Sequence, residues 1–435
     1  MSKLRVLATM AVLPVFVAAC NSAEVVDDSD DAAADGTEQE EAADEGEAEE
    51  PAADPDAEVI RVGALHPLTG ALADDGSAMN AAAQMAVDDI NEAGGIQSLG
   101  GAQLELVSAD SQGDPEIGQT ETQRMIDEGV VAIIGAFQSA VASNVATLAE
   151  RSQVPFVIDV AVDDAIITDD SRYTFRLQPN ATDMGVLGAR NLAAIAETAG
   201  ETVERVAYMH EETAFGTSVY EAFAAEADQL GMEIVETISY NAFEVSDLTT
   251  ELSRVAAADA DVLAATGYYP DGVLLAREAM AVEPDVSAVF GVAHGAFDIA
   301  QFPEDVPDGA QYYFDSNYRF DATDDAIQEI RDRYQERTGN DMRTAAVLSY
   351  QAAILIADAL ERAGSAETEA LRDAISDSSL DPLLAYAGPI EFDETGENVN
   401  AAPIVMQVQD GSVVQVHPGE FAEAEAEFPR VPWED

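Results

Sequence analysis

The amino-acid sequence predicts an α/β protein made of two doubly wound lobes, each with a parallel sheet. Short runs rich in β-branched residues, such as 59–65 and 130–134, alternate with longer amphipathic stretches such as 75–92. Strands separated by helices at this spacing form parallel sheets that helices cover on both faces. The alternation restarts near residue 183, so the chain should build two lobes in succession.

Further elements follow the same rhythm. A strand at 103–107 precedes Asp114-Pro115, a helix start in which Asp caps free amides and Pro takes the first helical position. The next expected helices and strands lie at 139–152, 154–158, 183–198, 203–209, 214–230, 232–239, 246–258, 261–266, 270–281 and 288–292. Long helices at 322–338 and 344–363 then precede a strand pair, 403–409 and 413–417, around Asp410-Gly411.

The charge of the chain excludes several kinds of partner. Its 435 residues include 85 Asp and Glu but only 19 Lys and Arg, for a formal net charge of −66. Nucleic acid is excluded because phosphate binding needs clustered cations, and adsorption to anionic lipid is disfavoured for the same reason. At molar salt the Debye length falls to about 3 Å, which screens this self-repulsion. We interpret the acidic surface as an adaptation to saline surroundings; an acidic proteome with no strict need for salt is the alternative.

Residues 1–19 have the features of a secretory signal peptide. A cationic start precedes an apolar run at 6–17, which is too short to span a membrane because the hydrocarbon core takes about 20 residues. The run leads into residues 17–20 (VAAC), which resemble a bacterial lipobox. Cys20 is the only cysteine, so the chain can form neither an internal disulfide nor a cysteine metal cluster. We expect two acyl chains on Cys20 to anchor the protein to a membrane.

The segment after Cys20 reads as a tether. Residues 21–58 hold 17 acidic side chains and no Lys or Arg. Such a tract cannot bury enough apolar surface to offset chain entropy, so we expect it to be disordered. As a flexible coil it would reach about 35 Å, which lets a domain leave the membrane surface.

No catalytic signature marks an enzyme. The sequence has no G-x-G-x-x-G after a strand, no P-loop, no H-E-x-x-H and no G-x-S-x-G. The four histidines, His66, His210, His294 and His417, lack the spacing of metal ligands. We therefore expect neither an enzyme nor a bound metal or cofactor.

Candidate binding residues follow the strands, because parallel sheets present free amides to ligands at their carboxyl ends. Ser139 begins a helix after the strand at 130–134, with its amide available. Tyr268 and Tyr269 follow the strand at 261–266 and could wall an apolar ligand, with packing between the lobes as the alternative. Phe215 could equally be a core residue at a helix start.

Seven segments resemble, in order, the branched-chain amino acid (Leu/Ile/Val-binding) type of periplasmic solute-binding protein, which has the type I periplasmic binding protein fold. Each segment is weak evidence alone, but together they extend over nearly all of residues 59–435. They are 61–70 (RVGALHPLTG), 86–96 (AVDDINEAGGI), 110–115 (DSQGDP), 131–139 (VAIIGAFQS), 210–216 (HEETAFG), 267–271 (GYYPD) and 389–396 (PIEFDETG).

The resemblance implies a Venus flytrap receptor, in which two lobes joined by three crossovers close on a small ligand and present it to the permease of an ABC importer. The expected lobes are 59–177 with 318–385, and 178–317 with 386–435. Together with the lipid anchor, this implies a monomer on the extracytoplasmic face of the cell membrane that binds a small amino acid or related nitrogen compound. An amide, urea, or an aromatic or carboxylic acid is the alternative ligand.

The resemblance also assigns site residues by position. The family's carboxylate-binding serine aligns with Ser139, and its threonine aligns with Asp163, in a loop that contains Ala161. The other aligned positions are Phe215, Tyr268 and Tyr350 on the aromatic wall, and Asp75, where the family often has an aromatic residue.

One departure from the family concerns the ligand's ammonium. The acidic residue that grips it should lie near 291–295, but this stretch reads GVAHG, with His294 as its nearest polar side chain. In one interpretation Asp163 takes over and binds an ammonium, amide or guanidinium. In the other, Asp163 caps the local backbone, and Ser139 with nearby amides binds a carboxylate, which a free Asp163 would repel.

Two other classes of function are alternatives. A partner receptor could read the closed form, but no spanning helix or cytoplasmic module follows the lobes before residue 435, so we expect no autonomous sensor. An enzyme would need an activated nucleophile or an acid–base pair in the cleft, for which Asp75, Asp163 and His294 are the candidates.

Overall fold

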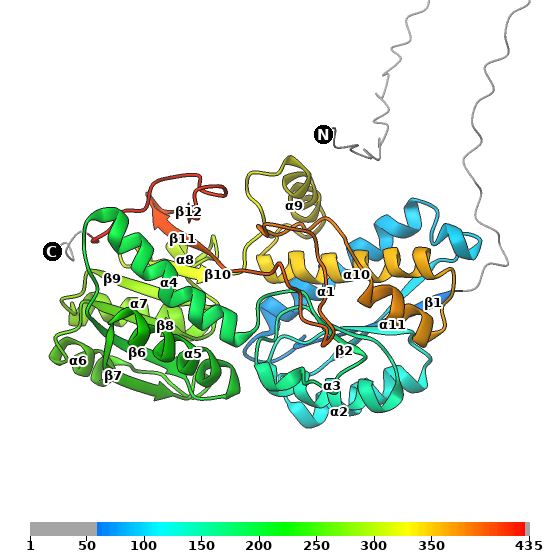
Figure 1. The fold of residues 1–435 in the computed structure, drawn as a ribbon, viewed down its shortest axis with the longest axis horizontal. Helices are drawn as coiled ribbons and strands as arrows, with labels where there is room; N and C mark the ends of the chain where they lie inside the picture. Colours follow the sequence, from blue (N-terminus) through cyan, green and yellow to red (C-terminus); the bar gives the residue numbers. More distant parts are fainter. Residues whose placement is uncertain (1–58, 431–435) are drawn as a thin grey trace, which may run out of the picture. The chain divides into compact units, whose positions relative to one another are not determined.

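The structure, a computed structural model, describes residues 59–430. These residues form two α/β lobes, each built around a mainly parallel sheet (Figure 1). The two-lobed α/β fold expected from the sequence is confirmed. The expected signal peptide, the expected lipidation site Cys20 and the expected acidic tether lie outside the described residues.

The first lobe contains a five-stranded parallel sheet. Its strands are β1 (Ile60–His66), β2 (Leu104–Asp110), β3 (Ala132–Gly135), β4 (Phe156–Ile158) and β5 (Thr174–Arg176). The order across the sheet is β2-β1-β3-β4-β5. The connections therefore change direction beside β1, and α/β sheets open a crevice for ligands at such a point.

Helices cover both faces of this sheet. They are α1 (Ala73–Glu92), α2 (Pro115–Asp127), α3 (Ser139–Ser152), α9 (Asp325–Thr338), α10 (Thr344–Ala363) and α11 (Thr368–Ser376), with 3-10 turns η1 (Gln97–Leu99) and η2 (Asp164–Ile166). Val62 and Leu65 of β1 point to opposite faces and belong to separate cores. The Val62 core contains α1, α9, α10 and α11, whereas the Leu65 core contains α2 and α3.

The second lobe contains a seven-stranded sheet. Its strands are β6 (Arg205–Glu211), β7 (Glu233–Tyr240), β8 (Val262–Thr266), β9 (Ala288–Val292), β10 (Phe314–Asn317), β11 (Ile404–Gln409) and β12 (Ser412–His417). The order is β12-β11-β10-β9-β8-β6-β7. Strands β6 to β10 run parallel, and β11 and β12 add an antiparallel edge.

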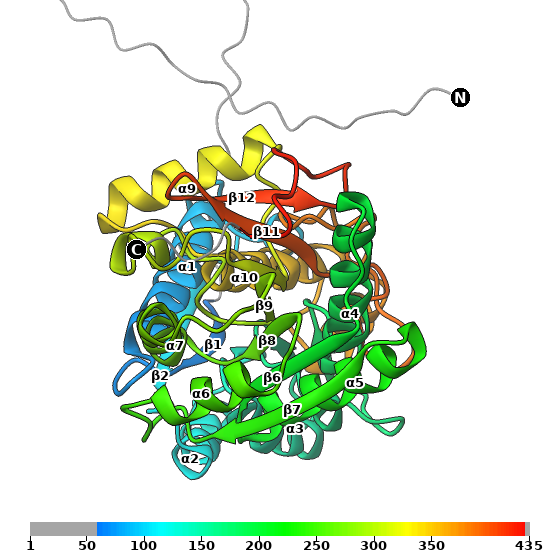
Figure 2. The same ribbon diagram turned by 90° about the vertical axis from the view of Figure 1, so that its left-hand side faces the viewer.

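The helices of the second lobe also divide between two faces. They are α4 (Ala181–Ala199), α5 (Ala214–Leu230), α6 (Thr249–Ala257), α7 (Tyr269–Val282) and α8 (Phe302–Asp305). Helices α4 and α5 share one core, and α6, α7 and α8 share the other. Figure 2 shows this sheet with α4 and α5 on one side and α7 on the other.

Within residues 59–430 the chain passes between the lobes three times: after β5, after β10 and before β11. The third passage lies later than the expected boundary at 385/386. Tyr386, Ile390 and Ala401 pack in the core of the first lobe, and a bridge pairs Glu397 with Arg176 of β5. We therefore propose that residues 386–401 belong to the first lobe.

The sequence patterns did not predict β5, β10, α8 or α11. Strand β10 is the most consequential omission, because it lies buried between β9 and β11 and its end borders the cleft. Its sequence, Phe-Asp-Ser-Asn, lacks the apolar run expected of a buried strand. Polar strand residues are tolerated here because neighbours bond them; Asp315 Oδ1, for example, accepts from the His294 amide.

Gly135 shows how the first sheet approaches the cleft. Its φ of +143° lies in a region that favours glycine, and a Cβ there would lie 2.5 Å from the carbonyl oxygen of Leu65. Only glycine therefore lets β3 end this close to β1, and the chain turns at once into the loop that reaches α3.

Helix α10 is long and apolar enough to span a membrane by length and composition. However, 78% of its apolar window is buried inside the protein, where it packs against α1. Its hydrophobicity is accounted for by its place in the core of the first lobe.

Replacing Asp114 with Ala should destabilise the fold through α2. Asp114 Oδ1 accepts from the amides of Glu116 and Ile117 at 2.8 and 2.9 Å. Loss of this N-cap should lower the free energy of unfolding by about 1 kcal/mol in urea titrations at constant salt. Asp114→Asn keeps the acceptor and serves as the control; equal losses in both variants would contradict a capping role.

Candidate functional site

The main pocket lies between the two lobes, at the carboxyl ends of their strands. It contains about 380 Å³ of space not filled by protein atoms, part of which is open to solvent. Loops after β3 and β4 form its side in the first lobe, and loops after β8, β9 and β10 with the start of α5 form the other side. Its lining residues are Phe137, Ser139, Val160, Ala161, Val162, Phe215, Gly267, Tyr268, Ala293, Gly295, Asn317 and Tyr318.

Ser139 supplies the polar end of this pocket in the first lobe. It is the first residue of α3 and is only 3% exposed. The first amides of a helix have no partner within it, and the helix dipole makes this end attractive to anions. The Ser139 hydroxyl accepts a 3.3 Å hydrogen bond from the Asp163 amide, which leaves its own proton free for donation. A carboxylate is the group that this arrangement suits best.

Aromatic rings from both lobes form part of the remaining wall. Tyr268 lies at the centre, with ring centroids 6.1 Å from Phe137, 5.4 Å from Phe215 and 5.3 Å from Phe243. The contact with Phe137 joins the two lobes across the cleft. Burial raises the pKa of the Tyr268 phenol well above its usual range, so the ring stays neutral. These rings suit an apolar, flat or branched ligand body.

Asp271 fixes the position of Tyr268. Its carboxylate accepts from the Tyr268 amide at 2.9 Å and from the Tyr240 hydroxyl at 2.6 Å. Burial raises the pKa of Asp271 to about 7. The residue acts on the ligand only through Tyr268, because it does not line the pocket.

Asp163 lies beside the pocket but does not line it. Its Oδ1 accepts a 3.2 Å hydrogen bond from the amide of Ala165 and so caps η2. This geometry supports the second of the two interpretations of Asp163, in which it serves the backbone. Its peptide N–H, rather than its carboxylate, reaches Ser139.

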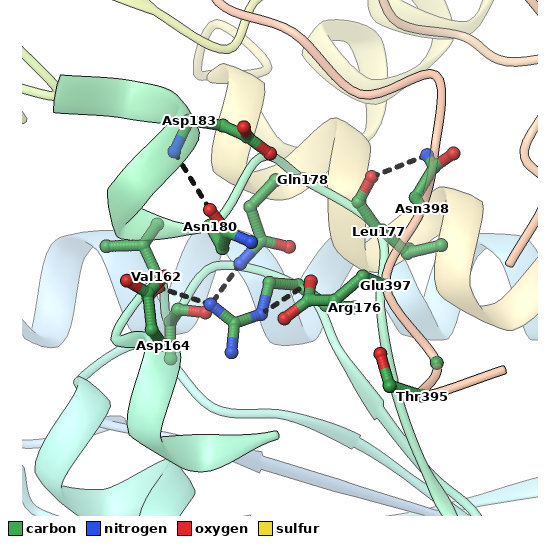
Figure 3. Close-up of polar contacts among 12 residues, drawn as sticks. Val162, Asp164, Arg176, Leu177, Gln178, Asn180, Asp183, Thr395, Glu397 and Asn398 are labelled. Atoms are coloured by element: carbon green, nitrogen blue, oxygen red, sulfur yellow. Dashed lines mark hydrogen bonds and ion pairs between the residues drawn. The ribbon is translucent and has the colours of Figure 1, made fainter. Parts of the chain in front are cut away.

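A buried arginine holds the loop that contains Ala161 and Val162 (Figure 3). Arg176, at the end of β5, has no exposed surface, and its guanidinium donates to the carbonyls of Val162 and Asp163. Gln178 donates to the carbonyl of Ala161 at 2.7 Å. Side chains from the first crossover thereby fix three successive carbonyls, those of residues 161–163. We call the loop that contains these residues the ligand loop.

The same arginine reaches the third crossover. Its Nε lies 3.4 Å from a carboxylate oxygen of Glu397, and Asn398 donates to the Leu177 carbonyl at 2.9 Å. Burial raises the pKa of Glu397 and of Asp183, which lie near this cluster. The ligand loop and two crossovers therefore form one hydrogen-bonded unit (Figure 3).

A second compartment adjoins the main pocket and shares four wall residues with it. It contains about 340 Å³ of space not filled by protein atoms, part of which is open to solvent. Asp75 lies here, 6% exposed and ion-paired with Arg343, and not in the main pocket. Its lining residues are Asp75, Phe137, Gly295, Asp298, Ile299, Asn317, Tyr318, Arg343, Thr344 and Ala345.

His294 and Tyr350 lie outside both compartments. The His294 ring is fully buried, stacks on Phe297 at 3.9 Å and accepts from the Ala296 amide. Tyr350 belongs to the core of the first lobe and donates to Asp89 at 2.7 Å.

Four of the eight expected ligand residues, Ser139, Ala161, Phe215 and Tyr268, line the main pocket. The residues missed fall into two groups. The first group stands inside segments already singled out, so its position after a strand was an available signal: Phe137, Val160, Val162, Gly267, Ala293 and Gly295. Asn317 and Tyr318 follow β10, which carried no strand pattern.

A buried Ser–His–Asp group near the cleft does not have the geometry of a nucleophilic triad. His66 Nε2 and Ser349 Oγ both bond the same oxygen of Asp159, at 2.8 and 2.7 Å. In a triad the histidine stands between serine and aspartate, and the serine is accessible. Here all three side chains are fully buried.

No group of three or more His, Cys, Asp and Glu side chains suited to a metal ion occurs within residues 59–430.

Comparisons with known proteins agree on one family. The profile of the family described as periplasmic binding protein matches residues 59–412. Among curated relatives, Leu/Ile/Val-binding protein homolog 7 of Brucella abortus (strain 2308) is 28% identical over 397 residues, covering 87% of this chain and 96% of the relative. The resemblance drawn from the seven segments is therefore confirmed.

Solved structures agree on the fold. A leucine binding protein from Thermotoga maritima has a TM-score of 0.71 at 23% identity, covering 82% of this chain and 97% of its own. An ABC transporter solute-binding protein from R. palustris, in complex with benzoate, has a TM-score of 0.68 at 17% identity, covering 82% and 95%. These likenesses confirm the type I fold.

Replacing His294 with Asn should flatten the acid side of the stability profile. Burial lowers the pKa of His294 to about 3, whereas an unfolded histidine titrates near its ordinary 6.5. Between these values only the unfolded chain binds the proton. The free energy of unfolding therefore decreases as the pH is lowered, by up to about 1.4 kcal/mol per pH unit. Asn keeps the acceptor for Ala296 but does not titrate. Urea titrations from pH 7 to pH 4 measure the slope; an unchanged slope would contradict this assignment.

Proposed function

We propose, from the premise that this chain belongs to the periplasmic binding protein family, that it captures a small carboxylic acid with an apolar body for an ABC importer. The family is one of binding proteins and not of enzymes. The observation that carries the ligand class is the composition of the main pocket: Ser139 at a helix N-terminus faces walls of Phe137, Phe215 and Tyr268.

The same pocket argues against an α-amino acid as the preferred ligand. Of the residues within 59–430 that line it, none is Asp or Glu. An ammonium next to a carboxylate at Ser139 would therefore be desolvated without an anionic partner, which is costly. Asp75 and Asp298 border the second compartment, beyond Phe137 and Tyr318, whereas an α-ammonium lies directly beside its carboxylate.

Named ligands of structural relatives fit this range of chemistry. Solved proteins of this fold are described in complex with Leu, with isoleucine and with benzoate. All three ligands combine a carboxylate with an apolar body. Among these ligands we favour a carboxylic acid without an ammonium group. The family's ammonium-binding acidic residue is expected near 291–295, and in this stretch the residues that line the pocket are Ala293 and Gly295, which carry no charge.

The mode of action that we propose is hinge closure. Phe137 of the first lobe and Tyr268 of the second meet across the cleft and both line the main pocket, so a ligand body packed against them would contact both lobes. Arg176 and Glu397 tie the ligand loop to two crossovers. A ligand that contacts this loop would therefore also act on the segments that connect the lobes. A permease would then bind the closed form.

We place the protein on the extracytoplasmic side of the membrane, held by lipid on Cys20. The lipobox-like residues 17–20 and the acidic stretch 21–58 support an anchor and tether. The net charge of −66 supports operation in concentrated salt. Monomeric action is the simplest assembly for a receptor that closes around one ligand.

Benzoate should stabilise the protein, whereas benzamide and benzylamine of the same size should not. Ligand at 100 times its Kd should add about 2.7 kcal/mol of stability. Thermal unfolding of the described residues in high salt measures this, with leucine and phenylacetate in the same panel. Stabilisation by benzylamine but not by benzoate would overturn the proposed ligand class.

Matched variants separate the two polar residues at the pocket. Ser139→Ala should weaken binding of the stabilising acid by about 10- to 100-fold, since a hydrogen bond to a charged group is lost. Asp163→Asn keeps the oxygen that accepts from the Ala165 amide in η2, and should preserve affinity for the acid. Loss of affinity in Asp163→Asn alone would instead support a ligand contact by Asp163.

Replacing Cys20 with Ser should release the protein from membranes, because no acyl chains can then be attached. In the natural host or a bacterial expression strain, the variant should move from the membrane pellet to the soluble extracytoplasmic fraction. Retention of the variant in the pellet would contradict the lipid anchor at this position.

A further inference from the structure

The second compartment combines residues of both lobes. Asp75, Arg343 and Thr344 come from the first lobe, whereas Gly295 and Asp298 come from the second. Its 340 Å³ is close to the size of the main pocket. A ligand group held here would therefore touch both lobes and favour their closure.

The hydroxyl of Thr344 is the polar group in this compartment that indicates a ligand-binding position. It is the first residue of α10 and only 4% exposed. Its Oγ1 has no hydrogen-bond partner among the residues that the structure describes. Leaving a buried hydroxyl unpaired is unfavourable, so such a group indicates a position that a ligand completes.

The charges of the compartment are already paired within the protein. Arg343 binds Asp75, and Asp298 lies 3.5 Å from Arg319. Burial raises the pKa of Asp75 and brings that of Asp298 to about 6. A fully charged ligand group would disturb these pairs, whereas a neutral group that can both donate and accept would fit between a hydroxyl and carboxylates.

The two compartments are adjacent, because four residues line both. Phe137, Gly295, Asn317 and Tyr318 line the main pocket and the second compartment alike. A carboxylate at Ser139 leaves the opposite end of an apolar body facing this shared wall.

We propose that the second compartment binds a hydroxyl group at the far end of the ligand, with Thr344 as a specificity-determining residue. The preferred substrates are then hydroxylated aromatic or arylaliphatic carboxylic acids. This inference rests on the proposed function, because it takes the ligand's carboxylate to lie at Ser139.

Calorimetric titrations with two matched pairs of acids test the proposal: benzoate with 4-hydroxybenzoate, and phenylacetate with 4-hydroxyphenylacetate. The pairs differ in length, so they bracket the reach from Ser139 to Thr344. In at least one pair the hydroxylated acid should bind about tenfold more tightly, the effect of one added hydrogen bond. In Thr344→Val this preference should vanish while the parent acid keeps its affinity.

Two further variants control for indirect effects. Thr344→Ser retains the hydroxyl and should retain the preference. Ser77→Ala removes a hydroxyl from the neighbouring outer cavity, which Ser77 and Arg343 line, and should also leave the preference intact.

The outcomes distinguish the two proposals. If the parent acids bind but neither pair shows a preference, or if the preference survives in Thr344→Val, the subsite is overturned and the proposed function stands. If none of the four acids binds, the proposed ligand class is overturned and the subsite with it.

Discussion

Arg176 places a guanidinium where none of its surface reaches water. Burial lowers its pKa, and such a charge is tolerated only when nearby groups replace its hydration. Two backbone carbonyls of the ligand loop and the carboxylate of Glu397 do so. The same contacts that satisfy the charge therefore fix the loop beside the pocket and tie it to the third crossover. Binding geometry and lobe connection depend on one desolvated side chain.

This arrangement explains how a pocket with few polar groups can be specific. Parallel strands of both sheets end at the cleft, so each connecting loop contributes only a few residues to the pocket. The first lobe contributes Ser139 and the start of α3, while the second contributes Tyr268, which Asp271 holds in place. In the binding mode that we propose, polar recognition is divided between Ser139 in the main pocket and Thr344 in the second compartment.

The sequence predicted the architecture well because the fold is set by repeating local patterns. Apolar runs and caps located nearly every helix and parallel strand, and strand ends located Ser139, Phe215 and Tyr268. Position along the chain could not give the direction of a side chain, however. His294 stands in a cleft loop, yet its ring turns inward onto Phe297 while Ala293 and Gly295 face the pocket.

Other parts of the site could not be predicted because their positions depend on contacts between residues that are distant in the sequence. Strand β10 has a polar sequence, and its place in the sheet depends on partners distant in the chain, such as the His294 amide that bonds Asp315. Its end supplies Asn317 and Tyr318 to both compartments. Aligned position likewise placed Asp75 near the ligand but did not reveal Arg343, its partner from α10.

An anionic ligand presents a particular problem for a chain with a net charge of −66. In dilute buffer the summed field would oppose the approach of a carboxylate. At molar salt the Debye length of about 3 Å limits that field to immediate neighbours, so the amides of α3 and the Ser139 hydroxyl decide the local interaction. An acidic surface and a carboxylate site are therefore compatible in concentrated salt, where short-range hydrogen bonds and apolar contact outweigh long-range repulsion.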